Sequence, residues 1–262
     1  MDLDLDDADA LCTAASSGLG LASAEALARE GANVAVCGRT EAHLDDARET
    51  LRAAGTGDVL AVQADITDPD HVAAFVEQTA EEFGGIDHVV TSAGGPPSGP
   101  FEDIADRDWY QAYDMLVMSA VWTLREAAPH LRASDAGSVT AITSRSVREV
   151  LDGLLLSNAV RRAVVGLVKT VSHEMAPDIR ANAVLPGAHE TGRIEDLIEA
   201  AVERGEFPDY EAGYRDWAAD VPLERIGDPE ELGDVVAFLA SPRASYVNGA
   251  ALAVDGGSLR SV

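Results

Sequence analysis

The feature of this sequence that most constrains its fold is a repeated alternation of short apolar runs with segments long enough for helices. The first runs are "ALCT" (10–13) and "NVAVCG" (33–38), which precede segments of helical pattern at 19–30 and 41–54. The next run is "DVLAVQAD" (58–65), which precedes 69–83, where Pro69 stands near an expected helix start. Further runs are "IDHVVTSAG", "GSVTAIT" (137–143), "IRANAVLPG" (179–187) and "AALAVDGG".

This alternation predicts βαβ units, and therefore an α/β fold with a doubly wound, mostly parallel sheet covered by helices on both faces. The 262 residues suit a single domain of this kind, and no internal repeat or low-complexity linker divides them. Ligands of such sheets bind beyond the carboxyl ends of the strands, where the strand order reverses. We therefore expect the functional residues directly after the apolar runs.

The charge of the chain limits its partners. It has 46 acidic and 19 basic residues, and its formal net charge is −27. Nucleic acids and anionic membranes repel such a surface, so we expect neither as a partner. The acids are dispersed along the chain, and their mutual repulsion is screened within roughly 3 Å at about 1 M salt. We therefore expect adaptation to high salt, the alternative being an unusually acidic protein from an ordinary environment.

Cysteine, histidine and terminal patterns predict a cytoplasmic protein without a metal site. Cys12 and Cys37 lie in apolar runs and are expected to be buried, inert thiols. The acidic start "MDLDLDD" lacks the positive region of a secretory signal, and no apolar stretch approaches 18 residues. Five histidines show no metal-ligand spacing and are expected on helix surfaces or beside strands: His43, His71, His88, His130 and His173.

The first apolar run leads into a loop of small residues, "TAASSGLG" (13–20). A Gly-rich turn that opens a helix lets backbone N–H groups and the positive helix end bind a pyrophosphate. Gly18 and Gly20 would allow this close approach, although Ala14 stands where a first glycine would fall. Taken alone, the loop is also compatible with a tight turn that binds nothing.

Essentially the whole chain resembles the short-chain dehydrogenase/reductase family, whose opening motif is Thr-Gly-x-x-x-Gly-x-Gly. Four more segments match that family in order: "ADITD", "SAGG" (92–95), "LPGAHET" and "VNGAALAVDGG". The resemblance implies one Rossmann-type domain over residues 1–262, a substrate lid at about 188–222, and a homotetramer or homodimer. It also implies nucleotide contacts from Thr13, Ala15, Ser16, Ser17, Gly18, Leu19, Gly20, Arg39, Thr40, Asp65, Ile66, Ser92, Ala93, Gly94, Arg161, Pro186, Gly187, His189 and Thr191.

The end of the second run bears on which nucleotide is bound. Arg39 and Thr40 stand where an acidic residue would bind the ribose 2′-hydroxyl of NAD. The planar donors of a guanidinium suit the 2′-phosphate of NADP instead. The sequence therefore favours NADP(H), with NAD as the alternative if Arg39 stacks on the adenine or pairs with a surface acid.

The resemblance also locates four catalytic positions, three of which are altered. The segment "LLLSNAVRRAVVGLVKT" is similar to the family's tyrosine helix and places Ser157 at the tyrosine position and Arg161 at the lysine position. Ser144 in "AITSRS" matches the serine that binds the substrate oxygen, and Leu116 stands at the asparagine position. Serine is far less acidic than a phenol of pKa about 10, and arginine does not release a proton. We predict Ser144, Ser157 and Arg161 as the catalytic set of a divergent, 3-oxoacyl-carrier-protein reductase-like branch.

Two other features bear on the chemistry. His189 is a candidate proton donor, the alternative being a solvated loop histidine. Aromatic residues between 194 and 222 indicate either an apolar pocket roof or a packed helical hairpin: Phe207, Tyr210, Tyr214 and Trp217. The sequence thus supports an oxidoreductase that reduces a carbonyl or oxidises a secondary alcohol with NADP(H). The alternative is a catalytically impaired NAD(P)-binding homologue acting as a sensor or structural subunit.

Overall fold

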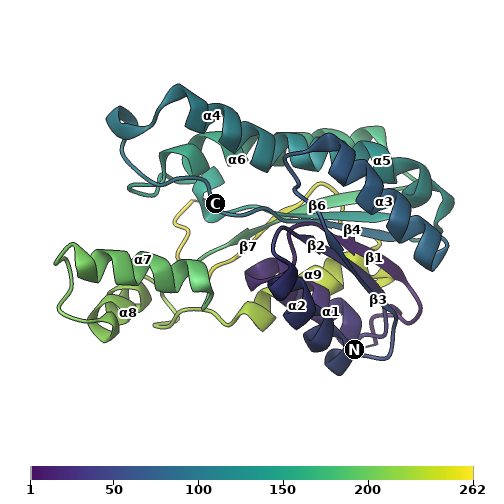
Figure 1. Cartoon of the computed structure of the whole chain (residues 1–262), viewed down its shortest axis with the longest axis horizontal. Coiled ribbons are helices and arrows are strands. Elements are labelled where there is room, and N and C mark those ends of the chain that lie inside the picture. Colours follow the sequence, from purple (N-terminus) through teal and green to yellow (C-terminus); the bar gives the residue numbers. More distant parts are fainter. Residues whose placement is uncertain (1, 262) are drawn as a thin grey trace.

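A parallel sheet of seven strands forms the centre of the computed structural model, which describes residues 2–261 (Figure 1). The strand order is β3-β2-β1-β4-β5-β6-β7, and every neighbouring pair is parallel. This confirms the predicted doubly wound α/β fold. The strands are β1 (Asp9–Cys12), β2 (Asn33–Gly38), β3 (Val59–Gln63), β4 (His88–Thr91), β5 (Ser138–Ile142), β6 (Arg180–Pro186) and β7 (Ala251–Val254).

Helices cover both faces of the sheet (Figure 1). One face is covered by α1 (Gly18–Arg29), α2 (Glu41–Ala54) and α9 (Pro229–Ala240). The other face is covered by α3 (Pro69–Phe83), α5 (Ser119–Ala133) and α6 (Leu155–Glu174), with α4 (Asp106–Tyr113) beside α6. The observed bounds of α2 and α3 are the ones predicted from the sequence, 41–54 and 69–83.

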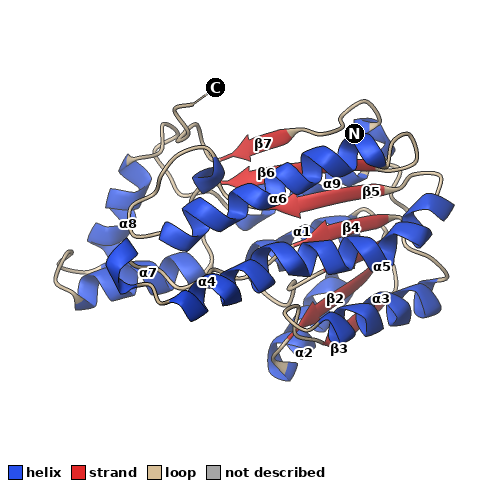
Figure 2. Cartoon of the chain, turned by 90° about the horizontal axis from the view of Figure 1, so that it is seen from above, coloured by secondary structure: helices blue, strands red, loops and turns tan. Residues whose placement is uncertain are grey.

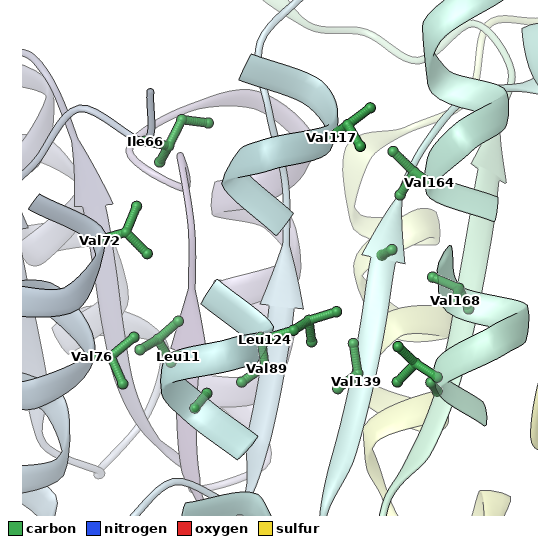
Figure 3. Close-up of a cluster of buried hydrophobic side chains, with 14 of the residues drawn as sticks. Leu11, Ile66, Val72, Val76, Val89, Val117, Leu124, Val139, Val164 and Val168 are labelled. Atoms are coloured by element: carbon green, nitrogen blue, oxygen red, sulfur yellow. The ribbon is translucent and has the colours of Figure 1, made fainter. Parts of the chain in front are cut away.

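The strands are mostly apolar because helices cover both faces of the sheet. In β2, Val34 and Val36 pack toward α1 and α2, whereas Ala35 and Cys37 belong to the opposite cluster. This alternation is the two-residue period of a strand. On the second face, valines and leucines of α3, α5 and α6 interdigitate with those of the strands (Figure 3).

Local signals fix where the helices begin. The Asp68 carboxylate accepts the backbone N–H groups of Asp70 and His71, and Pro69 occupies the first turn of α3. At α9 the Asp228 and Glu231 side chains form a reciprocal capping box. Side chains that accept these otherwise unpaired N–H groups stabilise the first turns of α3 and α9.

The helical stretch that comprises α4 and α5 is continuous but changes its hydrogen-bond pattern midway. Between α4 and α5, Asp114–Met118 forms a π-helical turn. Such turns are rare in proteins overall, but those that occur are often found at functional sites. The extra residue changes the direction in which side chains and backbone groups point. Leu116 lies within this turn and is buried.

Two further helices lie beyond the carboxyl ends of the strands, toward which the strand arrows point (Figure 2). They are α7 (Gly192–Glu203) and α8 (Tyr210–Ala219), and they pack against each other. Among residues 2–261, no helix has the length and apolar character needed to span a bilayer.

Candidate active site

The site is centred on the exits of β1 and β4, where the strand order reverses. The loops that leave these strands are joined by Thr13 and Ser92. The Thr13 hydroxyl donates to the Ser92 carbonyl at 3.0 Å, and its oxygen accepts the Ser92 backbone N–H at 3.1 Å. The two loops are therefore held together at the position where a doubly wound sheet binds its ligand.

The loop after β1 has the compact shape that a phosphate site requires. Ala14 and Gly18 both adopt left-handed backbone conformations, with φ of +46° and +57°. A Cβ atom at Gly20 would lie 2.9 Å from the Ala14 carbonyl oxygen and 3.0 Å from Ala15 Cα, so only glycine fits there. Cys37 supports the loop, because its carbonyl accepts the Ala15 N–H at 2.9 Å and its sulfur accepts the Ala14 N–H at 3.4 Å.

The start of α1 offers donors to an anion. Ser17 occupies the capping position, yet its side chain accepts none of the first-turn N–H groups. Those N–H groups have no partner within the helix and carry the positive end of its dipole. Thr191 faces the same place from the loop after β6, with its methyl carbon 3.8 Å from where a Cβ of Gly18 would lie. The residues Ser16, Ser17, Gly18, Leu19 and Gly20 thus form a cradle that fits a pyrophosphate.

The exits of β2 and β3 lie side by side. Arg39 and Thr40 are exposed after β2, and the Gln63 side chain donates to the Arg39 carbonyl at 2.9 Å. Burial raises the pKa of the Asp65 carboxyl, but hydrogen bonds from the Thr67 N–H and hydroxyl and the charge of Arg39 outweigh it, so the net shift is downward. The guanidinium of Arg39 is therefore exposed beside an ionised carboxylate.

Arg161 links two neighbouring loops. Its side chain is buried, and its Nη1 donates to the Thr143 carbonyl at 3.3 Å while Nη2 donates to the Gly94 carbonyl at 3.1 Å. Thr143 follows β5 and Gly94 follows β4, so one guanidinium joins two strand exits. Arg161, Leu116 and Ser92 line one small cavity. The other residues of its lining are Thr91, Ala93, Ser119, Ala120, Ile142 and Val164.

Three serines come together where β5 meets the start of α6. The Ser146 N–H donates to Ser144 Oγ at 3.1 Å, and Ser146 Oγ lies 3.1 Å from Ser157 Oγ. Ser146 is fully buried, whereas Ser157 is 8% exposed and Ser144 is half-buried. The fold therefore assembles Ser144 and Ser157 through a residue between them.

His189 follows the Pro186–Gly187 turn, which is tightly packed. A Cβ at Gly187 would lie 2.7 Å from Asp255 Cβ. The His189 ring is buried against Gly227, with Nδ1 3.4 Å from the Gly187 carbonyl, so the expectation of a solvated loop histidine is wrong. Burial lowers the pKa of His189. Its role as a proton donor stays a prediction.

The α7–α8 hairpin and the preceding loop border an open pocket of about 260 Å³. Its lining is Glu190, Ile194, Glu195, Tyr210, Glu211 and Tyr214. Three of these six residues are glutamates, and the Tyr214 hydroxyl donates to Glu190, which raises the pKa of Tyr214 to about 12. The lining is thus more acidic than the apolar roof that the aromatic residues indicated.

The remaining titratable residues of interest are structural. Cys12 and Cys37 are buried as predicted, and burial raises both thiol pKa values, that of Cys37 to about 12. His88 was expected beside a strand, but this prediction is wrong, because His88 is the first residue of β4 and is 1% exposed. Its Nδ1 lies 2.9 Å from Ser138 Oγ. Within the described chain, no three or more His, Cys, Asp or Glu residues are grouped as a metal site would need.

Comparison with known proteins agrees with this geometry. A family model described as enoyl-(acyl carrier protein) reductase matches residues 13–258. An uncharacterised oxidoreductase of Bacillus subtilis, YvrD, is 32% identical over 267 residues, which cover 100% of both chains. The protein described here is a member of the short-chain dehydrogenase/reductase family.

Solved structures of the same family superpose closely. The L-sorbose reductase of Gluconobacter frateurii, in complex with NADPH and L-sorbose, has a TM-score of 0.95 and 32% identity, covering 100% of both chains. A short-chain oxidoreductase of Pseudomonas aeruginosa PAO1, described as containing an atypical catalytic centre, has a TM-score of 0.91 and 30% identity over 99% of this chain and 100% of its own. The chain is thus similar to an NADPH-bound reductase and to a relative with unusual catalytic residues.

The sequence does not predict the roles of two residues of the site. Ser146 is a second serine two positions after Ser144, and this spacing in "SRS" was the available signal. Cys37 was expected only to be buried, yet its carbonyl and sulfur hold the loop after β1. Both act through tertiary contacts, which a one-dimensional pattern does not report.

Proposed function

We propose that this protein is an oxidoreductase that binds NADP(H) and reduces a carbonyl or oxidises a secondary alcohol. The observation that carries the proposal is the juxtaposition of two elements. They are the uncapped cradle at the start of α1 and the set of Ser144, Ser157 and Arg161 at the neighbouring strand exits. The site therefore combines a place for a nucleotide with hydroxyl donors for a substrate oxygen.

The cradle fits the nucleotide on structural grounds, since the first N–H groups of α1 are not capped by Ser17 and Gly20 lets the loop after β1 pack closely against the start of the helix. Thr191 would contact the phosphates from the opposite side, and Arg39 would pair with a 2′-phosphate. When bound, NADPH supplies the hydride that reduces a carbonyl carbon.

The protein's own hydroxyls would handle the substrate oxygen. Ser144 Oγ already accepts the Ser146 N–H, so its own proton is available to donate to that oxygen. Ser157 would donate a second hydrogen bond and thereby stabilise the negative charge that develops on it. The substrate oxygen would take up a proton from this hydroxyl as the hydride arrives. Water beside Ser157, or His189, would then return a proton to the hydroxyl, because Arg161 does not release one.

The experiment that tests this proposal is a turnover assay of NADPH oxidation over a panel of ketones, ketoses and 3-oxoacyl thioesters, with the reverse reaction on secondary alcohols. We expect turnover for at least one class, a Kd for NADPH lower than that for NADH, and loss of this preference in Arg39→Gln. Tight NADPH binding without turnover of any substrate would refute the oxidoreductase assignment. A preference for NADH would refute the role of Arg39.

The second candidate is a nucleotide-binding sensor or structural subunit. It is favoured by the engagement of the Arg161 guanidinium with the carbonyls of Thr143 and Gly94, which gives this residue a structural role. Absent turnover together with a change of assembly on NADPH addition, seen by analytical ultracentrifugation, would support it. The same measurement tests our further proposal that the chain forms a homotetramer or homodimer. We also propose that residues 188–222, which include α7 and α8, act as a substrate lid.

A further inference from the structure

Ser146 contacts both hydroxyl-bearing residues of the predicted catalytic set, Ser144 and Ser157. Its backbone N–H donates to Ser144 Oγ, and its side-chain oxygen lies 3.1 Å from Ser157 Oγ. It sits in the short helical turn Arg145–Val147, directly after β5. One residue therefore joins the end of β5 to the first turn of α6.

The direction of the Ser146–Ser157 hydrogen bond follows from burial. Ser146 is 0% exposed, and among the described residues its hydroxyl has Ser157 Oγ as its one side-chain hydrogen-bond partner. If Ser157 donated, the Ser146 hydrogen would be buried without an acceptor, which costs about 1–3 kcal/mol. The lower-energy arrangement has Ser146 donating to Ser157.

This direction decides what Ser157 can do. A serine hydroxyl has a single hydrogen, so a Ser157 that accepts from Ser146 keeps its own hydrogen for another acceptor. Ser157 as a residue is 8% exposed whereas Ser146 is 0% exposed, so Ser157 is the less enclosed of the two.

We infer that Ser146 is a positioning residue that orients the Ser157 hydroxyl as a hydrogen-bond donor to the substrate oxygen. Ser144 and Ser157 then form two converging donors that are both held by Ser146, through its N–H and its hydroxyl. The arrangement stabilises charge on the oxygen without a phenol. This inference rests on the proposed oxidoreductase function.

The test is a double-mutant cycle with Ser146→Ala and Ser157→Ala. Alanine at 146 keeps the backbone N–H to Ser144, so only the contact with Ser157 is lost. We expect Ser146→Ala to lower kcat about tenfold, as loss of one oriented hydrogen bond would, with KM and the Kd for NADPH changed less than about twofold. In the Ser157→Ala background, Ser146→Ala is expected to have no further effect on kcat. Ser146→Cys, a weak donor of similar size, is expected to be intermediate.

The control is Ser172→Ala, which removes another buried hydroxyl of α6, one that donates to the Lys169 carbonyl. It should leave kcat unchanged. Full activity of Ser146→Ala, or effects of Ser146→Ala and Ser157→Ala on kcat that multiply in the double variant, would overturn the inference while the oxidoreductase function stands. If the wild-type protein binds NADPH but turns over no substrate, the proposed function fails first and the inference fails with it.

Discussion

Replacing Arg161 by methionine removes the hydrogen bonds of a buried guanidinium to the Thr143 and Gly94 carbonyls while keeping most of the apolar stem. The donated contacts, to Thr143 O at 3.3 Å and to Gly94 O at 3.1 Å, are long for their type, so each is assigned the lower end of the charged range, about 1.5 kcal/mol. The expected loss of stability is therefore about 3 kcal/mol, or a fall in Tm of about 6–12 °C for a chain of this length.

The assay is differential scanning fluorimetry of Arg161→Met beside Arg162→Met, with NADPH affinity measured in parallel. Arg162 is the next residue of α6 and is exposed, so its replacement should shift Tm by less than about 1 °C. Because Gly94 lies in the loop that the resemblance places against the nucleotide, we expect the NADPH Kd of Arg161→Met to rise at least about tenfold, equivalent to about 1.4 kcal/mol. If both variants melt alike and bind NADPH alike, Arg161 does not connect the strand exits as described.

Three further predictions concern Gly20, the buried His88 and the net charge of the chain. Gly20→Ala should abolish measurable NADPH binding by calorimetry, because its Cβ would lie 2.9 Å from Ala14 O, whereas Gly166→Ala, with open space around it, should bind normally. Burial lowers the pKa of His88 to about 4, so the unfolded state binds the proton between about pH 6.5 and 4 and stability falls by about 3 kcal/mol as pH is lowered through that window. His88→Asn should flatten the Tm–pH curve there, and an unchanged slope would contradict this assignment. Finally, the net charge of −27 leads us to propose adaptation to salt, so Tm should rise steadily with KCl up to about 3 M; equal stability at low salt would count against it.

The sequence was sufficient for the fold because its local signals agree with its long-range pattern. Helix α3 begins at Pro69 after a capping Asp68, and β2 is apolar and buried after Asn33 because helices cover both faces of the sheet. The π-helical turn at Asp114–Met118 was not foreseen, since one extra residue in a turn leaves the apolar period nearly unchanged. The sequence predicted that the functional residues follow the strands, whereas the strand order itself comes from the structure.

The candidate site was less predictable, because its side chains meet only through tertiary packing. Ser144, Ser157 and Arg161 were located by their spacing within a familiar pattern, but Ser146 carries no motif. His88 was misplaced for a related reason: its burial depends on a hydroxyl at Ser138, fifty residues away, that satisfies the imidazole. Polar residues that pair across strands cannot be told from solvated ones by a pattern that records only apolar periodicity.

Ala14 has a consequence for how the nucleotide loop moves. An L-residue other than glycine at φ +46° is strained by about 1–2 kcal/mol, and this strain disappears whenever the loop opens locally. Local opening is therefore easier than it would be with glycine, and a bound nucleotide would have to hold the loop closed against that relief. Bound nucleotide should therefore slow amide hydrogen exchange in residues 13–20 more than it slows exchange in the strands. The exchange rate of this loop would then measure cofactor binding.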